Sequence, residues 1–315
     1  MIALAIDLGG TKLSLAVFTE DGTILYKEIT ALNNRTGNQV GQLITSSIKK
    51  ILASQKDNGN NIDSIGIAVP GISRKKSGTV WAPNIQGWED YPLLQEVKEI
   101  NNEIPVSIDS DRACYILGES WKGNAKGCKD AIYLAVGTGI GAGILVNGSV
   151  LNGAHDIAGA IGWLALDRPF EDKYISCGCF EYHASGEGLA KVAREKIQSS
   201  NYVSELSKLN AITAHDVFYA YEKNDVVAMA VIKQAIEFWG MAIANLVSLF
   251  NPEKIILGGG VFGPGVKFIS DIKKEASKWA QPVSMKQVSI EASALGSDAG
   301  LYGAALLAFQ NLNSK

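Results

Sequence analysis

Glycine occupies every second position in one stretch of the chain, and this pattern constrains the fold more than any other feature of the sequence. The four residues are Gly137, Gly139, Gly141 and Gly143, and apolar runs flank them on both sides. Glycine carries no Cβ, so this spacing leaves one face of the backbone bare and lets a bulky group lie against its N–H groups. A concave array of backbone N–H groups binds anions, as in many phosphate sites. We therefore expect a phosphate-binding turn here.

The same glycines also match a dinucleotide-binding fingerprint, G-x-G-x-x-G/A, over residues 137–142. That fingerprint requires a helix directly after the glycines. Residues 143–151 instead have the pattern of a strand, a turn at Asn147-Gly148 and a second strand. This context disfavours a nicotinamide-dependent oxidoreductase and predicts a hairpin.

Two further glycine turns follow apolar strands. Gly9-Gly10 separates predicted strands at residues 3–8 and 12–18, and a third turn at residues 258–260 follows a strand that ends at Leu257. Two strand–glycine–strand units about half a chain apart suggest an internal duplication. Neither is a P-loop, because the pattern G-x-x-x-x-G-K-[ST] does not occur in the chain.

Length and composition bound the class of protein. A chain of 315 residues can form two lobes with separate cores, and 47% hydrophobic with 19% charged residues is typical of a globular protein. The net charge is −3 and the largest basic cluster is residues 74–76, so we expect no nucleic-acid partner. No apolar run reaches the length of about 18 residues that a membrane helix needs. With no signal-peptide pattern and only four cysteines, we expect a cytoplasmic protein.

A candidate catalytic carboxylate stands at the start of a helix. Residues 105–108 read as a strand, and Asp109-Ser110-Asp111 then leads into a helix with apolar residues at helical spacing. Ser110 is a good N-cap, which places Asp111 in the first helical turn, where the helix dipole favours an ionised carboxylate. Asp111 could serve only to stabilise this helix, but the glycine hairpins favour a functional role.

The remaining segments complete an α/β pattern. We expect an amphipathic helix around residues 40–52, a buried strand at 64–69 that ends at Pro70-Gly71, and an apolar helix at 229–250. The loop at 81–88 contains two tryptophans, for which core packing is at least as good an interpretation as ligand contact. A C-terminal helix has small residues on one face, which allow tight packing or a flat ligand. We place a small lobe at residues 1–122 plus 298–315 and a larger lobe at 123–297.

These motifs together resemble the repressor, open reading frame, kinase (ROK) family over nearly the whole chain. The matching motifs, in order, are Asp7-Leu-Gly-Gly-Thr-Lys12, Val69-Pro-Gly71, Ser110-Asp111-Arg-Ala, Gly137-Thr-Gly-Ile-Gly141, Gly178-Cys-Phe-Glu181, Leu257-Gly-Gly-Gly260 and Asp298-Ala-Gly300. The resemblance implies the two-lobed actin-like ATPase (ribonuclease H-like) fold, in which each lobe is a mixed sheet flanked by helices and a cleft lies between the lobes. It implies ATP-dependent phosphorylation of a sugar hydroxyl, by a glucokinase-like hexose kinase or an N-acetylhexosamine kinase. A homodimer would fit the family.

The resemblance also implies roles for individual residues. Asp111 falls at the position of the general base, and Asp7 would meet Mg²⁺ through water. The residues implied to hold the ATP phosphates are Asp7, Gly9, Gly10, Thr11, Lys12, Gly137, Thr138, Gly139 and Gly141, and Gly258, Gly259 and Gly260 would lie behind the adenosine. The positions implied for sugar binding are Gly71, Asn84, Ser110, Asp111, Ala160, Trp163 and Glu181.

Several of these positions depart from the family pattern. Ala160-Ile-Gly162-Trp163 stands where the family has Glu-x-Gly-His, and Ser110 replaces an asparagine. Trp163 could stack on a sugar or face the core, and under the second reading His155 or Asp156 could reach the sugar instead. We expect a preference for a substrate other than unmodified glucose, such as a 2-substituted hexose or a polyol.

The structural zinc of the family also lacks its ligands. Of its three cysteines only Cys179 is in place, with Asp172 and Tyr174 at the other two positions. A structural zinc needs four ligands, so we expect no zinc site. His155 and His183 remain open as ligands of a non-standard site.

One alternative function belongs to a different class. The family includes repressors, so a sugar-sensing, non-catalytic regulator that acts through protein contacts would explain an altered sugar pocket. We expect no DNA-binding domain before the first strand, which begins at residue 3. Asp111 favours the enzyme, because a sensor has no need of a general base.

Overall fold

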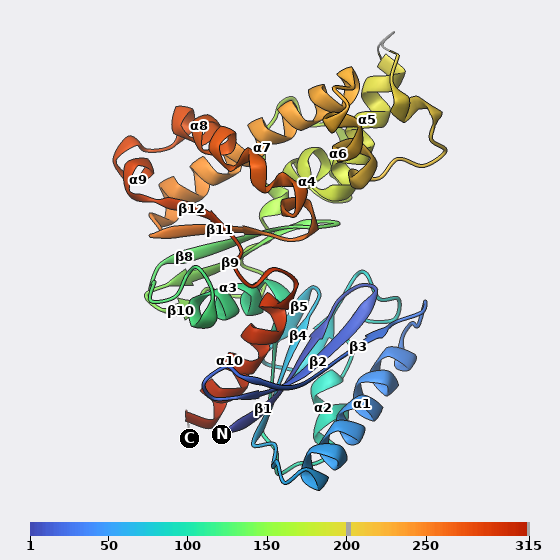
Figure 1. The fold of residues 1–315 in the computed structure, drawn as a ribbon, viewed down its shortest axis with the longest axis vertical. Coiled ribbons are helices and arrows are strands. Elements are labelled where there is room, and N and C mark those ends of the chain that lie inside the picture. Colours follow the sequence, from blue (N-terminus) through green and yellow to red (C-terminus); the bar gives the residue numbers. More distant parts are fainter. Residues whose placement is uncertain (200–202, 314–315) are drawn as a thin grey trace. The chain divides into compact units, whose positions relative to one another are not determined.

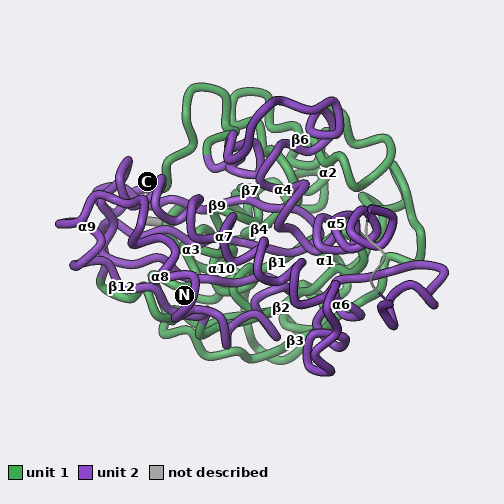
Figure 2. The backbone as a smooth tube through the Cα atoms, turned by 90° about the horizontal axis from the view of Figure 1, so that it is seen from above, with its two compact units in different colours: residues 1–127, 150–158, 294–315 green, residues 128–149, 159–293 purple. Residues whose placement is uncertain are grey.

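The computed structural model describes residues 1–199 and 203–313. The chain forms two compact units, drawn in two colours in Figure 2. The first unit comprises residues 1–127, 150–158 and 294–315, and the second comprises residues 128–149 and 159–293. The sequence predicted divisions at 122 and 298 and did not assign the short segment 150–158 to the first lobe. Residues 314 and 315 of that predicted lobe lie outside the described residues.

The first unit is built on a five-stranded mixed sheet in the order β3-β2-β1-β4-β7. β1 and β2 form an antiparallel hairpin, whereas β1, β4 and β7 run parallel to one another. The strands are β1 (Ile2–Leu8), β2 (Lys12–Thr19), β3 (Ile24–Ala31), β4 (Ser64–Val69) and β7 (Val106–Ser110), with a separate hairpin of β5 (Ile72–Arg74) and β6 (Thr79–Trp81). The helices are α1 (Asn38–Asp57), α2 (Leu93–Lys98), α3 (Asp111–Lys122) and α10 (Ala299–Asn313).

Strand β1 separates two cores of different character. Its large side chains, such as Leu4 and Ile6, are fully buried in a cluster that includes the apolar face of α1. Its small side chains, Ala3 and Ala5, face the opposite side, where α10 and α3 pack (Figure 1). Alternate strand residues point to opposite faces of a sheet, so the run of apolar residues in β1 encodes one face for bulky packing and one for close helix approach.

The backbone of α10 lies very close to the backbones of α3 and β4, and glycines stand at the points of contact. A Cβ at Gly303 would collide with the backbone carbonyl of Cys114 in α3, and a Cβ at Gly66 in β4 would collide with the carbonyl of Ala304. A Cβ at Gly118 of α3 would likewise strike the carbonyl of Ala299. The small residues of the C-terminal helix therefore serve tight packing within this unit.

The second unit repeats the strand order of the first. Its sheet runs β10-β9-β8-β11-β12, with an antiparallel β8–β9 hairpin and β8, β11 and β12 parallel. The strands are β8 (Ala131–Val136), β9 (Ile140–Val146), β10 (Ser149–Val150), β11 (Lys254–Gly258) and β12 (Ser289–Ala292). In both units a glycine hairpin opens the sheet and two parallel strands follow, so the predicted duplication is confirmed.

Six helices of the second unit matter for its core and its pocket. They are α4 (Cys179–Ala184), α5 (Gly186–Ser199), α6 (Ala214–Glu222), α7 (Val226–Phe250), α8 (Ile269–Trp279) and α9 (Pro282–Gln287). The second unit also contains short 3₁₀ turns: η1 (Ile161–Trp163) and η2 (Asp172–Tyr174) precede α4, η3 (Glu205–Lys208) lies between α5 and α6, and η4 (Gly260–Phe262) and η5 (Pro264–Phe268) follow β11. A further turn, η6 (Gly296–Asp298), precedes α10 in the first unit.

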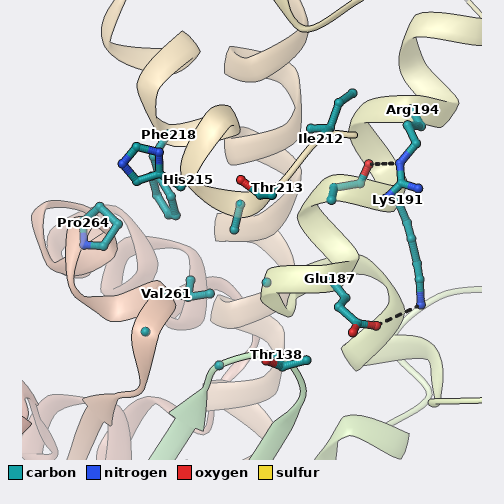
Figure 3. Close-up of a pocket in the computed structure, with 15 residues that line it drawn as sticks. Thr138, Glu187, Lys191, Arg194, Ile212, Thr213, His215, Phe218, Val261 and Pro264 are labelled. Carbon is teal, nitrogen blue, oxygen red and sulfur yellow. Dashed lines mark hydrogen bonds and ion pairs between the residues drawn. The ribbon is translucent and has the colours of Figure 1, made fainter. Parts of the chain in front are cut away.

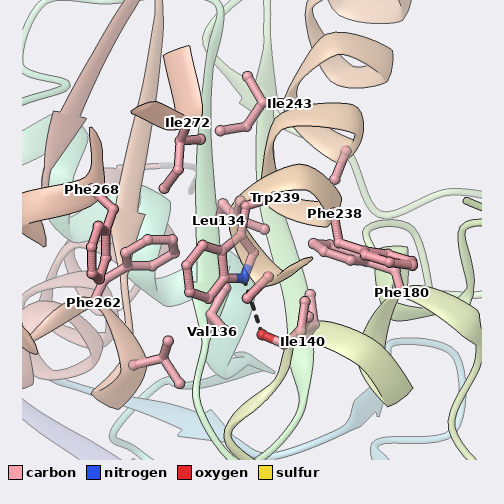
Figure 4. Close-up of a cluster of buried hydrophobic side chains, with 14 of the residues drawn as sticks. Leu134, Val136, Ile140, Phe180, Phe238, Trp239, Ile243, Phe262, Phe268 and Ile272 are labelled. Carbon is pink, nitrogen blue, oxygen red and sulfur yellow. Dashed lines mark hydrogen bonds between the residues drawn. The ribbon is translucent and has the colours of Figure 1, made fainter. Parts of the chain in front are cut away.

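Helix α7 is the centre of the second core. Among the described residues it is the one helix that is long and apolar enough to span a membrane, and 56% of its most apolar window is buried inside the protein. Phe238 and Trp239 pack beside the sheet, close to Phe180 and Phe262 (Figure 4). Asp225 caps the first turn, so the helix begins at Val226, three residues before the predicted start at Met229, and it ends at left-handed Asn251. These contacts define α7 as a core helix.

Candidate active site

The first glycine hairpin presents a bare backbone turn. The Gly9 N–H donates to the Lys12 carbonyl at 2.9 Å, which closes the turn between β1 and β2. A Cβ at Gly10 would meet no atom within 4 Å, and Thr11 and Lys12 are exposed. No packing constraint therefore explains Gly10, and its N–H is free to approach a ligand.

Asp7, at the end of β1, is held in an unusually acidic neighbourhood. Its carboxylate lies so close to α10 that a Cβ at Gly300 would approach the Asp7 Cγ to 2.6 Å. Burial, together with the negative charges of Asp111 and Asp298, raises the pKa of Asp7 to about 7, against the opposing charge of Lys12. Glycine at position 300 makes room for this carboxylate.

Asp111 stands at the junction of β7 and α3, as the sequence predicted. The Ser110 hydroxyl accepts a hydrogen bond from the Ala113 N–H at 3.3 Å and caps the helix, and the Asp111 Oδ1 accepts one from the Arg112 N–H at 2.7 Å. The expectation that the helix dipole keeps Asp111 readily ionised is incomplete. Burial raises the pKa of Asp111, and the charge and N–H of Arg112 only partly oppose that effect.

The two carboxylates fit a divalent cation. Asp111 contributes to the raised pKa of Asp7, so two acidic groups influence one another in a desolvated place. Like charges in such a place are relieved by a cation, and carboxylate oxygens are ligands that Mg²⁺ accepts. Asp7 could therefore hold this ion, and the negative charge of Asp111 would add to its attraction.

The other two sugar-site candidates of the first unit, Gly71 and Asn84, differ in how the surrounding structure holds them. Gly71 has a positive φ of 105°, and its carbonyl accepts a hydrogen bond from Arg112 Nη2 at 3.1 Å, which ties the turn after β4 to the helix that carries Asp111. Asn84 lies in an exposed turn. In the same loop Trp88 is buried and stacks on Tyr91 with 4.3 Å between ring centroids, so Trp88 serves the core.

The second hairpin, between β8 and β9, contains glycines with different surroundings. The Gly137 N–H donates to the Gly139 carbonyl at 2.9 Å, and a Cβ at Gly137 would meet nothing within 4 Å. A Cβ at Gly139 would instead lie 2.7 Å from the Glu181 carboxylate. Gly141 is inside β9, opposite Ala135. Gly137 is therefore open to a ligand, whereas Gly139 makes room for a side chain of the protein.

Glu181, in the first turn of α4, contacts this hairpin directly. Its Oε2 accepts a hydrogen bond from the Ile140 N–H at 2.7 Å, and burial raises its pKa. A Cβ at Gly162 would also lie 3.0 Å from the Glu181 side chain. The residue implied to bind sugar thus also contacts the turn between β8 and β9.

The glycines of the third turn also differ in whether they face open space or pack against the protein. A Cβ at Gly258 would collide with the Tyr133 hydroxyl, and Gly259 has a φ of 88° and lies against the Val136 carbonyl. Gly260, which begins η4, faces open space. Of these three glycines, Gly260 is the one that lines the pocket described next.

A pocket of about 630 Å³ lies within the second unit (Figure 3). Gly137, Thr138 and Gly260 contribute backbone to it. Its apolar lining comes from Ala190, Ile212, Ala214, Phe218, Val261 and Pro264, and its polar lining from Glu187, Lys191, Arg194, Thr213 and His215. A wall of apolar side chains with a few polar groups is typical of small-molecule sites, and this volume accommodates a nucleoside.

Two cations stand on one face of α5 in this pocket. Lys191 Nζ lies 3.7 Å from Glu187 Oε2, and Arg194 Nε donates to the Ala190 carbonyl at 3.2 Å (Figure 3). No motif pointed to these residues. The available signal was their spacing at 187, 190, 191 and 194, which places them on one helix face, but that spacing does not distinguish a ligand-facing side from a solvated one.

Trp163 does not face the core. Its side chain is 59% exposed, at the end of η1, so the core-packing alternative for this residue is wrong. Ala160 is partly buried next to the same turn. Asp156 belongs to the first unit and accepts the Lys75 N–H at 3.2 Å.

The residues at the zinc position do not suit a zinc ion. Tyr174 is buried and hydrogen-bonds to His183 Nε2 at 2.9 Å, while the other ring nitrogen, Nδ1, meets Gln234 at 3.0 Å. Both nitrogens of His183 are thus engaged. Within residues 1–199 and 203–313, no group of three or more His, Cys, Asp or Glu side chains is arranged to hold a metal ion.

Two sheets of identical strand order, each opened by a glycine hairpin, and a pocket that meets one of these hairpins define an actin-like ATPase fold. A family model described as "ROK family" matches residues 3–311, and the chain belongs to that family.

Individual relatives include both enzymes and regulators. The chain is 34% identical to a glucokinase of Halalkalibacterium halodurans, over 99% of this chain and 96% of that protein. It is 30% identical to a xylose repressor of Caldicellulosiruptor bescii, over 99% of this chain and 79% of the repressor. A solved ROK family glucokinase of Streptomyces griseus, in complex with glucose and AMPPNP, superposes with a TM-score of 0.79 at 28% identity, covering 98% of this chain and all of that one.

Proposed function

We propose that this chain transfers the γ-phosphoryl group of ATP to a hydroxyl of a sugar. The observation that carries the proposal is the pocket of about 630 Å³ whose lining includes the open backbone of Gly137 and Gly260. The Gly137 N–H closes the turn on the Gly139 carbonyl, and the bare glycine backbone leaves room for phosphates to approach the next N–H group, that of Thr138. The adjoining apolar wall suits a purine. The AMPPNP complex of the Streptomyces griseus relative supports the same choice of nucleotide.

Each unit has its own task in this proposal. In the second unit, the base and ribose occupy the pocket between α5, α6 and η4, and the phosphates meet Gly137 and Thr138. In the first unit, the Gly9–Lys12 turn contributes further phosphate contacts, and Asp111 acts on the sugar. Asp7 would hold Mg²⁺ through water, and that ion would supply positive charge to neutralise the phosphates.

Asp111 orients the acceptor hydroxyl and finally takes its proton. The sugar oxygen forms a bond to the γ-phosphorus while the bond from that phosphorus to the β,γ-bridging oxygen breaks, and ADP leaves with the electron pair. The transition state of phosphoryl transfer is loose, so positioning and charge stabilisation dominate over basicity. Burial, which raises the pKa of Asp111, makes this carboxylate a better proton acceptor than an exposed aspartate.

The preferred acceptor differs from unmodified glucose in this proposal. Ala160 removes a carboxylate that would accept hydrogen bonds from sugar hydroxyls, each worth about 1.5–3 kcal/mol when the acceptor is charged. The exposed ring of Trp163 offers a flat apolar surface for the C–H face of a sugar or for an N-acetyl methyl group. A 2-substituted hexose or a polyol suits these side chains better than glucose.

A sugar-sensing regulator is the second candidate, favoured by the 30% identity to a xylose repressor. A sensor would bind a sugar without consuming ATP. Retention of Asp111 and of an open nucleotide pocket favours the enzyme, because neither is needed to sense a sugar.

A coupled ADP-release screen over glucose, mannose, fructose, N-acetylated and amino sugars, and polyols tests the proposal. We expect sugar-dependent ADP release with at least one acceptor and a higher kcat/KM for a substrate other than glucose. Sugar binding by calorimetry without ADP release from any acceptor would favour the sensor instead.

A further inference from the structure

We propose that Tyr174, His183 and Gln234 form a metal-free clamp that holds α4 in place and thereby positions Glu181 against the phosphate hairpin. These three residues are called the clamp below. All of them, and the hairpin they act on, belong to the second unit. The inference goes beyond the proposed activity, because it concerns what replaces a structural metal in this chain.

The hydrogen bonds of the clamp form a directed chain. Gln234 Nε2 of α7 lies 3.0 Å from His183 Nδ1, and an amide nitrogen can only donate, so Nδ1 is the acceptor. Nε2 of the neutral ring therefore carries the proton and donates to the Tyr174 hydroxyl at 2.9 Å. The Tyr174 hydroxyl in turn donates to Glu171 Oε1 at 3.1 Å. Both ring nitrogens of His183 and the Tyr174 hydroxyl therefore have partners, as a buried polar network requires if it is to stabilise a fold.

Packing encloses this network. Tyr174 is 3% exposed and His183 is 5% exposed. The His183 ring stacks on Phe238 of α7 at 4.4 Å between centroids and meets the edge of Tyr174 at 5.4 Å. The Trp239 N–H of α7 also donates to the Ala184 carbonyl at 3.0 Å, which gives α4 a second attachment to the same core helix.

The clamp reaches the hairpin through Glu181. Helix α4 has only six residues, Cys179–Ala184, so Glu181 and His183 move as one short rigid piece. Glu181 Oε2 accepts the Ile140 N–H at 2.7 Å and lies where a Cβ at Gly139 would come. If α4 loses its attachment to Tyr174 and Gln234, the Glu181 carboxylate loses its fixed place and the turn at 137–140 loosens.

The side chains at this place do not suit the structural zinc that the fold family implies here. Both ring nitrogens of His183 are used, Tyr174 stands where a thiolate would be needed, and the Cys177 Sγ–H points to the Gly178 carbonyl at 3.8 Å. A tetrahedral zinc site needs four free N or S ligands, which this arrangement does not offer.

Hydrogen–deuterium exchange of the full-length protein tests the positioning role without any assay of activity. Tyr174→Phe and Gln234→Leu should each speed exchange in a peptide that covers residues 136–145 by about two- to tenfold, the range that one net hydrogen bond supplies. Tyr219→Phe makes the same change on an exposed tyrosine of the same unit and should leave that peptide unchanged. Ile243→Val in the core of α7 controls for general destabilisation, because it should not alter the hairpin selectively.

The double variant sharpens the interpretation. Because both bonds act through one histidine ring, Tyr174→Phe and Gln234→Leu together should speed exchange by less than the product of the single effects. Metal analysis of protein purified without chelator should find no stoichiometric zinc, and chelator should not change the melting temperature. One zinc per chain, or hairpin exchange that is unchanged in both single variants, would overturn the proposal.

Discussion

Gly137 and Gly139 stand two residues apart in one turn, yet their surroundings differ. Gly137 faces open space within the pocket, whereas Gly139 lies against the Glu181 carboxylate. Gly137→Ala should therefore leave the melting temperature nearly unchanged and weaken nucleotide binding, because the methyl group enters the ligand's space. Gly139→Ala should displace Glu181 from the Ile140 N–H, a charge-assisted bond worth about 1.5–3 kcal/mol.

Thermal unfolding and calorimetric titration with a non-hydrolysable ATP analogue measure the two effects separately. If Gly137→Ala lowers stability as much as Gly139→Ala does and binds nucleotide normally, the division between open and packed glycines is wrong.

Trp163 is a second position where a substitution should change substrate choice without changing the stability of the fold. Because its side chain is 59% exposed, Trp163→Ala should change the free energy of unfolding by no more than about 0.5 kcal/mol. The ranking of kcat/KM among sugars should nevertheless change, because the apolar surface for the substrate is lost. Phe170 lies seven residues further along the chain and is 70% exposed, so Phe170→Ala is the matched control and should leave the ranking intact. An unaltered ranking in Trp163→Ala would remove this residue from the sugar site.

At the scale of elements, α10 packs closely against α3 and β4 in the first unit. Gly303→Ala would drive a methyl group into the Cys114 carbonyl, and overpacking of this kind typically costs about 1–3 kcal/mol. Gly10→Ala adds the same methyl group in the same unit, where no atom lies within 4 Å, and should leave the melting temperature unchanged. Equal melting temperatures for the two variants would contradict the packing account.

The elements that the sequence predicted well are those with local signals. The Ser110 cap, the buried strand before Pro70 and both glycine hairpins depend on turn chemistry and periodicity, which act over a few residues. The pocket face of α5 was not predicted, because Lys191 and Arg194 look like any solvated cations until α6 and η4 are folded beside them. The clamp was missed for a similar reason: His183 and Gln234 lie 51 residues apart, and no local pattern pairs them.

At the scale of the whole molecule, two copies of one sheet topology serve different tasks. The first unit has the carboxylates Asp7 and Asp111, and the second has the pocket that we propose to bind the nucleotide. A saturating ATP analogue with Mg²⁺ should therefore slow hydrogen exchange in residues 136–141 and in the pocket faces of α5 and α6. The buried centre of α7 should not respond, because no residue of this helix is among those that line the pocket. Protection confined to the first unit would place the nucleotide elsewhere.

The central claim is that Asp111 acts in phosphoryl transfer to a sugar, and detection of the phosphorylated sugar by mass spectrometry tests it most directly. With the best acceptor from the screen, wild-type protein should form one sugar phosphate for each ADP released. Asp111→Asn should bind the ATP analogue with unchanged affinity while its kcat falls by about 10²–10⁴, the range for loss of a general base. A variant that keeps more than about a tenth of the wild-type kcat, well outside that range, would contradict the account, as would a wild-type protein that releases ADP without forming a sugar phosphate.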